Sequence, residues 1–217
     1  QAQMLELALR RRGVQAKCYS GTQFTEPFIK TAVAQAESDG VEHLVALPVY
    51  PLCGLSTTLA ALDDAQKALE ELPRTMTLRE ITGWHRHPDY FRFRADNILD
   101  FTKREGIDLH ATDTKLVFSA HGTPTKYLKS GPRYEEYVHE TCRMVARALG
   151  TTDYLLGYQN HTHRDIEWTS PSIEDVVQNL EASRVVVDAV SFMHEQSETL
   201  AELDGDLREL VESSGLE

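Results

Sequence analysis

The sequence has little cysteine and no long apolar run. Its 217 residues include only Cys18, Cys53 and Cys142, and none of them stands in a CxxC pair. This usage gives no zinc or iron–sulfur signature and favours a reducing compartment. No apolar run reaches the ~18 residues that span a bilayer, and no signal peptide is recognisable. We therefore expect a cytoplasmic protein without an iron–sulfur cluster.

Positive charge is also scarce, with 22 Lys and Arg against 34 Asp and Glu, a net charge of −12. This balance argues against nucleic acid as the main partner, because phosphate binding requires Lys and Arg. The sequence contains no GxGxxG and no GxxxxGK[ST], so a dinucleotide site and a P-loop have no support. A GxSxG motif is absent too, which makes Ser119 a poor hydrolase nucleophile. A neutral substrate or a metal ion remains open.

Strand and helix signals alternate along the whole chain. Several expected strands are rich in β-branched residues on both faces, which is typical of parallel strands buried between helices. We therefore predict an α/β fold of parallel sheets flanked by helices. The expected helices cover residues 2–12, 27–38, 56–72, 88–104, 132–149, 172–182 and 198–212. The expected strands cover residues 15–20, 43–49, 77–82, 115–119, 153–158 and 184–190.

The best candidate domain boundary is the polar stretch at residues 105–113. We predict an N-terminal half over 1–108 and a C-terminal half over 109–217. The chain opens with Gln1, already inside a helical pattern, which suggests that these residues belong to a longer polypeptide.

Polar residues follow two of the expected strands. The run 117–122, VFSAHG, ends a strand in His121 and a glycine, and the strand at 184–190 is followed by Glu195, Glu198 and Glu202. Ligands of parallel sheets bind at the carboxyl ends of the strands. An imidazole can accept protons or bind a metal. The spacing of the three acids predicts one helix face that accepts protons or guides a divalent cation.

Each of these features also has a purely structural interpretation. A single histidine at a strand end is more often hydrogen-bonded to a backbone carbonyl, and acids at a helix start are favoured by the helix dipole. Two HxH pairs, at 85–87 and 161–163, supply only two ligands each, so we interpret them as loop histidines. Aromatic residues near strand ends either stack on a flat ligand or close the core. They are Tyr50, Tyr158 and Trp168.

Four segments resemble the ferrochelatase family, and they occur in the family's order over nearly the whole chain. The first resembles LPxYP…STT, the second SAH[GS]xP…GDPY, the third the [WF]QS…W segment, and the fourth FxxDxxETLxExD. Here they read LPVYP at 47–51 with STT at 56–58, SAHGTP at 119–124 with GPRY at 131–134, YQN…EW at 158–168, and SFMHEQSETLAELD at 191–204.

The resemblance implies two similar Rossmann-like halves with a porphyrin cleft between them. It implies a lyase of haem biosynthesis that inserts ferrous iron into protoporphyrin IX or coproporphyrin III and releases two protons. By match, His121 and Glu198 are catalytic residues and metal ligands, and Glu195 and Glu202 form a proton or metal relay. Tyr50 and Trp168 match residues near the macrocycle. The family's N-terminal and C-terminal segments are missing, and no cofactor is implied beyond the iron substrate.

Two alternatives stay open. A related tetrapyrrole chelatase would insert cobalt or nickel, and the HxH segments keep this possibility alive. A divergent relative would bind a porphyrin without catalysis. The sequence leaves the choice of porphyrin, the oligomeric state and a peripheral membrane contact undecided.

Overall fold

The computed structural model describes residues 1–73, 76–161 and 166–217. The chain forms two compact units, one of Gln1–Pro48 with Ser56–Thr82 and one of Val49–Leu55 with Gly83–Glu217. Both contain parallel strands and helices, which confirms the predicted α/β class. This division by packing differs from the predicted boundary at residue 108, which stays a prediction about the family's two halves. The second unit includes the helix Pro88–Glu105 (α4), because that helix packs on the helix Tyr134–Ala148 (α6).

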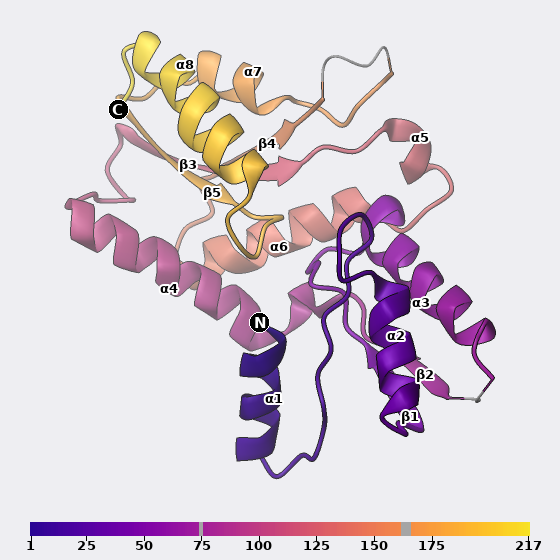
Figure 1. The fold of residues 1–217 in the computed structure, drawn as a ribbon. Helices are drawn as coiled ribbons and strands as arrows, with labels where there is room; N and C mark the ends of the chain where they lie inside the picture. The colour runs from indigo at the N-terminus through magenta and orange to yellow at the C-terminus, as the bar shows by residue number, and fades with distance from the viewer. Residues whose placement is uncertain (74–75, 162–165) are drawn as a thin grey trace. The chain divides into compact units, whose positions relative to one another are not determined.

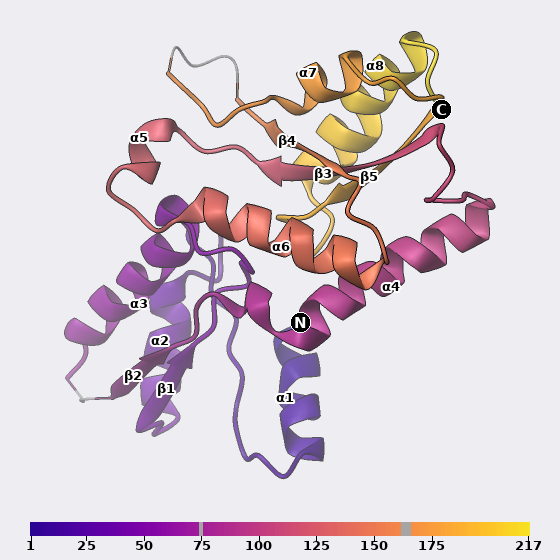
Figure 2. The same cartoon turned by 180° about the vertical axis from the view of Figure 1, so that it is seen from behind.

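The first unit is built around a sheet of two parallel strands, β1 (His43–Ala46) and β2 (Thr77–Glu80). Its small core gathers Val33, Ala68 and Met76, so the helices α2 (Ile29–Ser38) and α3 (Ala60–Glu70) pack together beside the strands (Figures 1 and 2). The unit also contains α1 (Ala2–Arg11), and a π-helical turn, η1 (Leu55–Leu59), leads into α3.

The predicted strand at 15–20 is wrong. A strand requires a neighbouring strand, and here the local polar groups bond to side chains instead: the Cys18 N–H donates to Glu6, and the Tyr19 hydroxyl donates to Asp39. The predicted helix at 27–38 begins later, at Ile29, with Phe28 in extended conformation before it.

The second unit contains a parallel sheet of β3 (Thr114–His121), β4 (Leu155–Gln159) and β5 (Arg184–Ala189), with β3 in the middle. Successive residues of β3 face opposite layers. Phe118 packs into a core with α4 and α6, and Val117 packs into a second core on the other face. That face carries α7 (Ile173–Gln178), the π-helix η3 (Glu198–Leu207) and α8 (Arg208–Ser213), as Figures 1 and 2 show.

Two short helices of this unit had no counterpart among the expected elements. They are the 3₁₀ helix η2 (Trp84–Arg86) and α5 (Thr125–Leu128). The helix predicted from Pro88 agrees closely with α4, where the His87 side chain accepts the Asp89 N–H and proline occupies the first turn.

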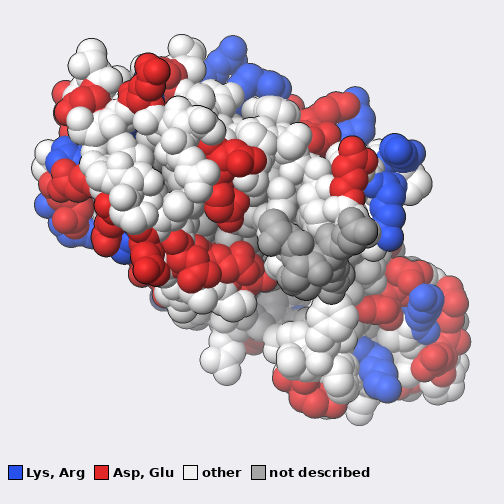
Figure 3. All heavy atoms as spheres, turned by 90° about the horizontal axis from the view of Figure 1, so that it is seen from above, with Lys and Arg blue, Asp and Glu red and all other residues white. Residues whose placement is uncertain are grey.

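Acidic side chains are prominent on the side of the second unit that carries α7 and α8 (Figure 3). This agrees with the negative net charge of the chain. The exposed acids on these elements and on η3 are Glu174, Asp175, Asp204, Asp206, Glu209 and Glu212.

Candidate functional site

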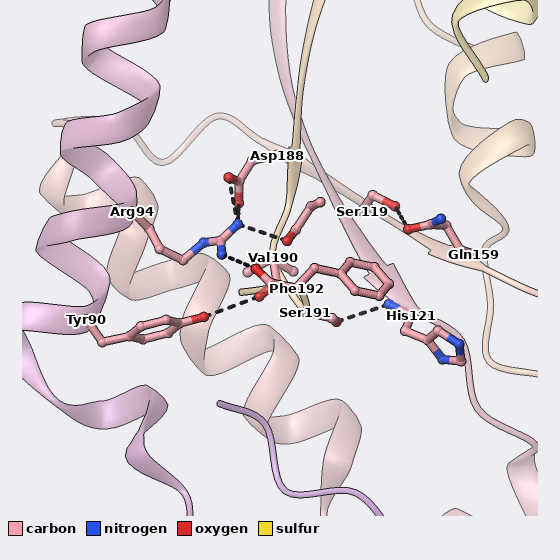
Figure 4. Close-up of polar contacts among 10 residues, drawn as sticks. Tyr90, Arg94, Ser119, His121, Gln159, Asp188, Val190, Ser191 and Phe192 are labelled. Atoms are coloured by element: carbon pink, nitrogen blue, oxygen red, sulfur yellow. Dashed lines mark hydrogen bonds and ion pairs between the residues drawn. The ribbon is translucent and has the colours of Figure 1, made fainter. Parts of the chain in front are cut away.

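His121 is the last residue of β3 and lies opposite Gln159 of β4. Its backbone is held from two sides: its N–H donates to Ser191 Oγ over 3.0 Å (Figure 4), and its carbonyl accepts from the Tyr134 hydroxyl over 3.0 Å. In the side chain, Nδ1 lies 2.6 Å from the Gly122 carbonyl and therefore donates to it. The neutral ring thus keeps its lone pair on Nε2, the atom that can take a proton or bind a metal.

Burial lowers the pKa of His121 below its ordinary value, and the neighbouring His161 lowers it further. The Gly122 carbonyl and the carboxylates of Glu198 and Glu202 act in the opposite direction without cancelling the effect. At neutral pH the imidazole is consequently neutral and ready to accept a proton.

Gly122 is required by close packing between two strand ends. Its N–H donates to the Gln159 carbonyl over 2.7 Å. A Cβ at this position would lie 2.6 Å from that carbonyl oxygen and 1.9 Å from Asn160 Oδ1. The glycine after the histidine therefore lets the loop after β4 approach the end of β3.

Glu198 and Glu202 lie on η3, and both are partly buried. The pKa of Glu198 is lowered. Burial alone would raise it, but the Ser197 hydroxyl, the backbone N–H of Glu198 and the imidazoles of His121 and His161 together prevail. The Ser197 hydroxyl donates to Glu198 Oε2 over 2.8 Å. Glu198 is therefore an ionised carboxylate within electrostatic range of two imidazoles.

The prediction that Glu195 shares a helix face with these acids is wrong. The helix begins only around Glu198, because the Gln196 carbonyl accepts the N–H groups of Thr199 and Leu200 and sets the first turn there. Glu195 precedes this turn and is exposed. Of the three acids predicted to share one helix face, only Glu198 and Glu202 lie on the helix, which is a π-helix rather than the expected α-helix.

Gln159 joins the strand ends to the acidic helix, a role that the sequence analysis did not assign. It is buried at the end of β4, and its Oε1 accepts from the Ser119 hydroxyl over 2.9 Å (Figure 4). Its Nε2 donates to the Glu198 carbonyl over 3.0 Å and to Glu202 Oε2 over 3.2 Å. A glutamine directly after the predicted strand 153–158 was the available signal, but only the fold shows its partners.

The turn after β5 is fixed by Arg94 of α4 (Figure 4). Arg94 is paired with Asp188 at 2.7 Å and donates to the carbonyls of Ala189 and Phe192, each over 2.9 Å. The turn presents Ser191 to the His121 backbone and places the Phe192 ring 6.0 Å from the His121 ring. The arginine thus positions the residues around the imidazole.

Aromatic rings extend from His121 toward the loop after β4. The His161 ring centre lies 5.3 Å from that of His121 and 5.4 Å from that of Trp168. Trp168 Nε1 is buried and, among the described residues, has no hydrogen-bond partner. The structure thus brings Trp168 into the group around His121. Tyr50 is 40% exposed, and within the described ranges no hydrogen bond or ring contact joins it to His121.

The histidine pairs differ from the expectation of loop histidines. His85 is fully buried, with Nδ1 3.2 Å from the Pro51 carbonyl and Nε2 3.2 Å from Glu140, so it is a structural residue. His161 contacts the site, and His163 lies outside the described residues. Among residues 1–73, 76–161 and 166–217, no group of three or more His, Cys, Asp or Glu is arranged to hold a metal ion. No described helix is long and apolar enough to cross a membrane.

Comparisons with known proteins agree on one family. A family model described as Ferrochelatase matches residues 1–217. The chain is 33% identical to a ferrochelatase of Thermosynechococcus vestitus and 32% identical to one of Synechococcus sp. (strain CC9311), covering all of this chain and 57% of each relative. A ferrochelatase of Gloeobacter violaceus is 31% identical, with 67% of its length covered. The chain spans somewhat more than half the length of most of these relatives, and it belongs to the ferrochelatase family.

Proposed function

We propose that this chain carries the metal-insertion centre of a porphyrin ferrochelatase, a lyase of haem biosynthesis. Ferrous iron enters protoporphyrin IX or coproporphyrin III, and two pyrrole N–H protons leave. Family membership supports this reaction class. The observation that carries the proposal is the His121 imidazole, whose Nδ1 is held by Gly122 and whose Nε2 is left for chemistry beside the Glu198 carboxylate.

Metal insertion requires bases for two protons, and the site offers a neutral imidazole and ionised carboxylates. His121 Nε2 accepts one pyrrole proton, and Glu198 accepts the second. Burial keeps His121 neutral, and the hydrogen bonds from the Ser197 hydroxyl and from the backbone N–H of Glu198 favour the ionised form of Glu198. Glu202 follows Glu198 on η3 and relays protons away from the ring.

The same two side chains serve the iron, which is a substrate here. Imidazole and carboxylate are both ligands of ferrous iron, and they would replace its water molecules before the ion passes to the ring. The single free lone pair of His121 Nε2 accepts a pyrrole proton only after it has released the metal. The reaction needs no cofactor beyond this iron, and no iron–sulfur cluster. We assign both Trp168 and Tyr50 to the macrocycle by family match, and the contact of Trp168 with the His161 ring supports this for Trp168.

The cellular setting is part of the same proposal. All of the cysteines are free thiols, which agrees with a reducing compartment such as the cytoplasm. The acidic surface over α7 and α8 suits a small-molecule enzyme better than a nucleic-acid binder (Figure 3).

Insertion of cobalt or nickel is the second candidate. The observation that favours it is the second imidazole at the site, His161, because nitrogen ligands bind Co²⁺ and Ni²⁺ more strongly than Fe²⁺. A protein that binds porphyrin without catalysis would need the aromatic rings near His121, but it would not need Glu198 and Glu202 as proton acceptors.

Replacing the imidazole tests the proposal. The natural polypeptide that contains this chain is mixed anaerobically with ferrous iron and each porphyrin, and the loss of porphyrin fluorescence is followed. We expect His121→Ala to lower insertion by about 10²- to 10⁴-fold while ring binding survives. His139→Ala is the matched control, since His139 is an exposed histidine of α6 in the same unit. Insertion at the wild-type rate in His121→Ala would contradict the assigned role.

A further inference from the structure

A second histidine accompanies the proposed catalytic one. His161 comes two residues after the end of β4, and its ring centre lies 5.3 Å from that of His121 with the ring planes at 64°. On its other side the ring meets Trp168, with centres 5.4 Å apart and planes at 77°. His161 is thus packed between the imidazole of the site and an indole, and it is partly buried.

The spacing of the two imidazoles suits a shared metal ion. A metal bound about 2.0–2.1 Å from a ring nitrogen lies roughly 3.2 Å from the ring centre, so two rings at a tetrahedral angle have centres about 5.2 Å apart. The observed 5.3 Å agrees with this separation.

The surroundings of His121 also suit a metal ligand. Histidine ligands almost always donate their other ring N–H to a carbonyl or carboxylate, and His121 Nδ1 donates to the Gly122 carbonyl at 2.6 Å. The Glu198 carboxylate interacts electrostatically with both imidazoles, so a cation between the rings would meet a nearby negative charge.

We propose that His161 is a second imidazole ligand for the metal ion substrate, acting together with His121. This inference rests on the proposed function, because it concerns the ion that is inserted. Two imidazoles would fill only part of the coordination shell of a divalent ion, so positions stay open for water and for the incoming ring nitrogens. Two imidazoles bind a divalent first-row ion and still release it.

A second imidazole has a consequence for metal preference. Affinity for nitrogen ligands rises from Fe²⁺ through Co²⁺ to Ni²⁺. A site with two imidazoles therefore binds Co²⁺ and Ni²⁺ more tightly than a site with one imidazole. Removing His161 should make the affinities for Co²⁺ and Ni²⁺ more similar to the affinity for Fe²⁺.

Titration with Co²⁺ alone, without porphyrin, tests the inference on the natural full-length protein. Cobalt absorption bands give the affinity, and the paramagnetically shifted proton signals of the bound imidazoles report each histidine ligand. We expect two such imidazoles in the wild type. In His161→Phe, which keeps a ring between His121 and Trp168, we expect one, with affinity reduced about 10- to 100-fold. His161→Gln gives a second variant with a polar side chain, and His139→Phe is the control that keeps wild-type binding.

Measuring insertion on the same variants separates the two proposals. Two cobalt-shifted imidazoles in the wild type that become one in His161→Phe would support the ligand role of His161. They would do so even if the wild type inserted no metal, because a failure of insertion would refute only the proposed function. Conversely, insertion that depends on His121, with Co²⁺ affinity and imidazole signals unchanged in both His161 variants, would overturn the ligand role and leave the proposed function intact.

Discussion

Arg94 is expected to stabilise the second unit more than any exposed arginine of the same helix. The Arg94 and Asp188 side chains are only 10% and 14% exposed, and they are joined by a contact of 2.7 Å. Arg94→Met keeps the apolar stem and removes the guanidinium. It leaves the Asp188 carboxylate nearly buried without its cation, and it leaves the carbonyls of Ala189 and Phe192 without their donor.

Removing one partner of a buried ion pair costs about 3–5 kcal/mol, because the remaining charge stays desolvated. We expect this loss in the free energy of unfolding of Arg94→Met, equivalent to a fall of about 10 °C in melting temperature. Urea unfolding followed by tryptophan fluorescence measures it. Both tryptophans of this chain, Trp84 and Trp168, belong to the second unit and therefore report its unfolding.

Two further variants make the test specific. Arg92→Met removes an exposed arginine from the same helix and should change stability by no more than about 0.5 kcal/mol. The double variant Arg94→Met with Asp188→Asn should recover part of the loss, since no buried charge remains. A cost of Arg94→Met below about 1 kcal/mol, or a double variant no more stable than the single one, would refute this reasoning.

Two predictions concern the site itself. Gln159→Met keeps the side-chain volume but removes the hydrogen bonds to Ser119, the Glu198 carbonyl and Glu202. We expect the free energy of unfolding to fall by about 2–3 kcal/mol, and kcat to fall while KM for the porphyrin changes little. A change in KM alone would contradict a positioning role. Because burial lowers the pKa of His121 and the reaction needs its neutral form, kcat/KM for metal insertion should fall as pH drops through a pKa below the ordinary 6.5, and an acid limb at or above 6.5 would be inconsistent with this environment.

The sequence predicts well those elements whose signals are local. The proline that opens the predicted helix 88–104 corresponds to the start of α4, and the apolar run that ends at His121 corresponds to the central strand β3. Parallel strands buried on both faces have a composition that reveals them without knowledge of their neighbours. The fold class and the position of His121 at a strand end follow from these signals.

Features that depend on distant partners were not predictable in the same way. The segment 15–20 was predicted to be a strand but has no neighbouring strand, and Glu195 has helical spacing but precedes the turn at which the helix begins. A π-helix and an α-helix share their residue preferences here, so spacing could not distinguish them. The contacts of Gln159 and His161 with the site arise from strand register and loop packing, which no single segment encodes.

The most direct test of the central claim is iron insertion by the natural polypeptide, measured anaerobically by loss of porphyrin fluorescence, with wild type and Glu198→Gln side by side. Glu209→Gln, which changes an exposed acid of α8, is the control. The site described here predicts metallation by the wild type and the control and a large loss in Glu198→Gln. Equal rates in all three proteins, or ring binding by the wild type without any metallation, would contradict the claim that His121 and the acids of η3 insert the metal.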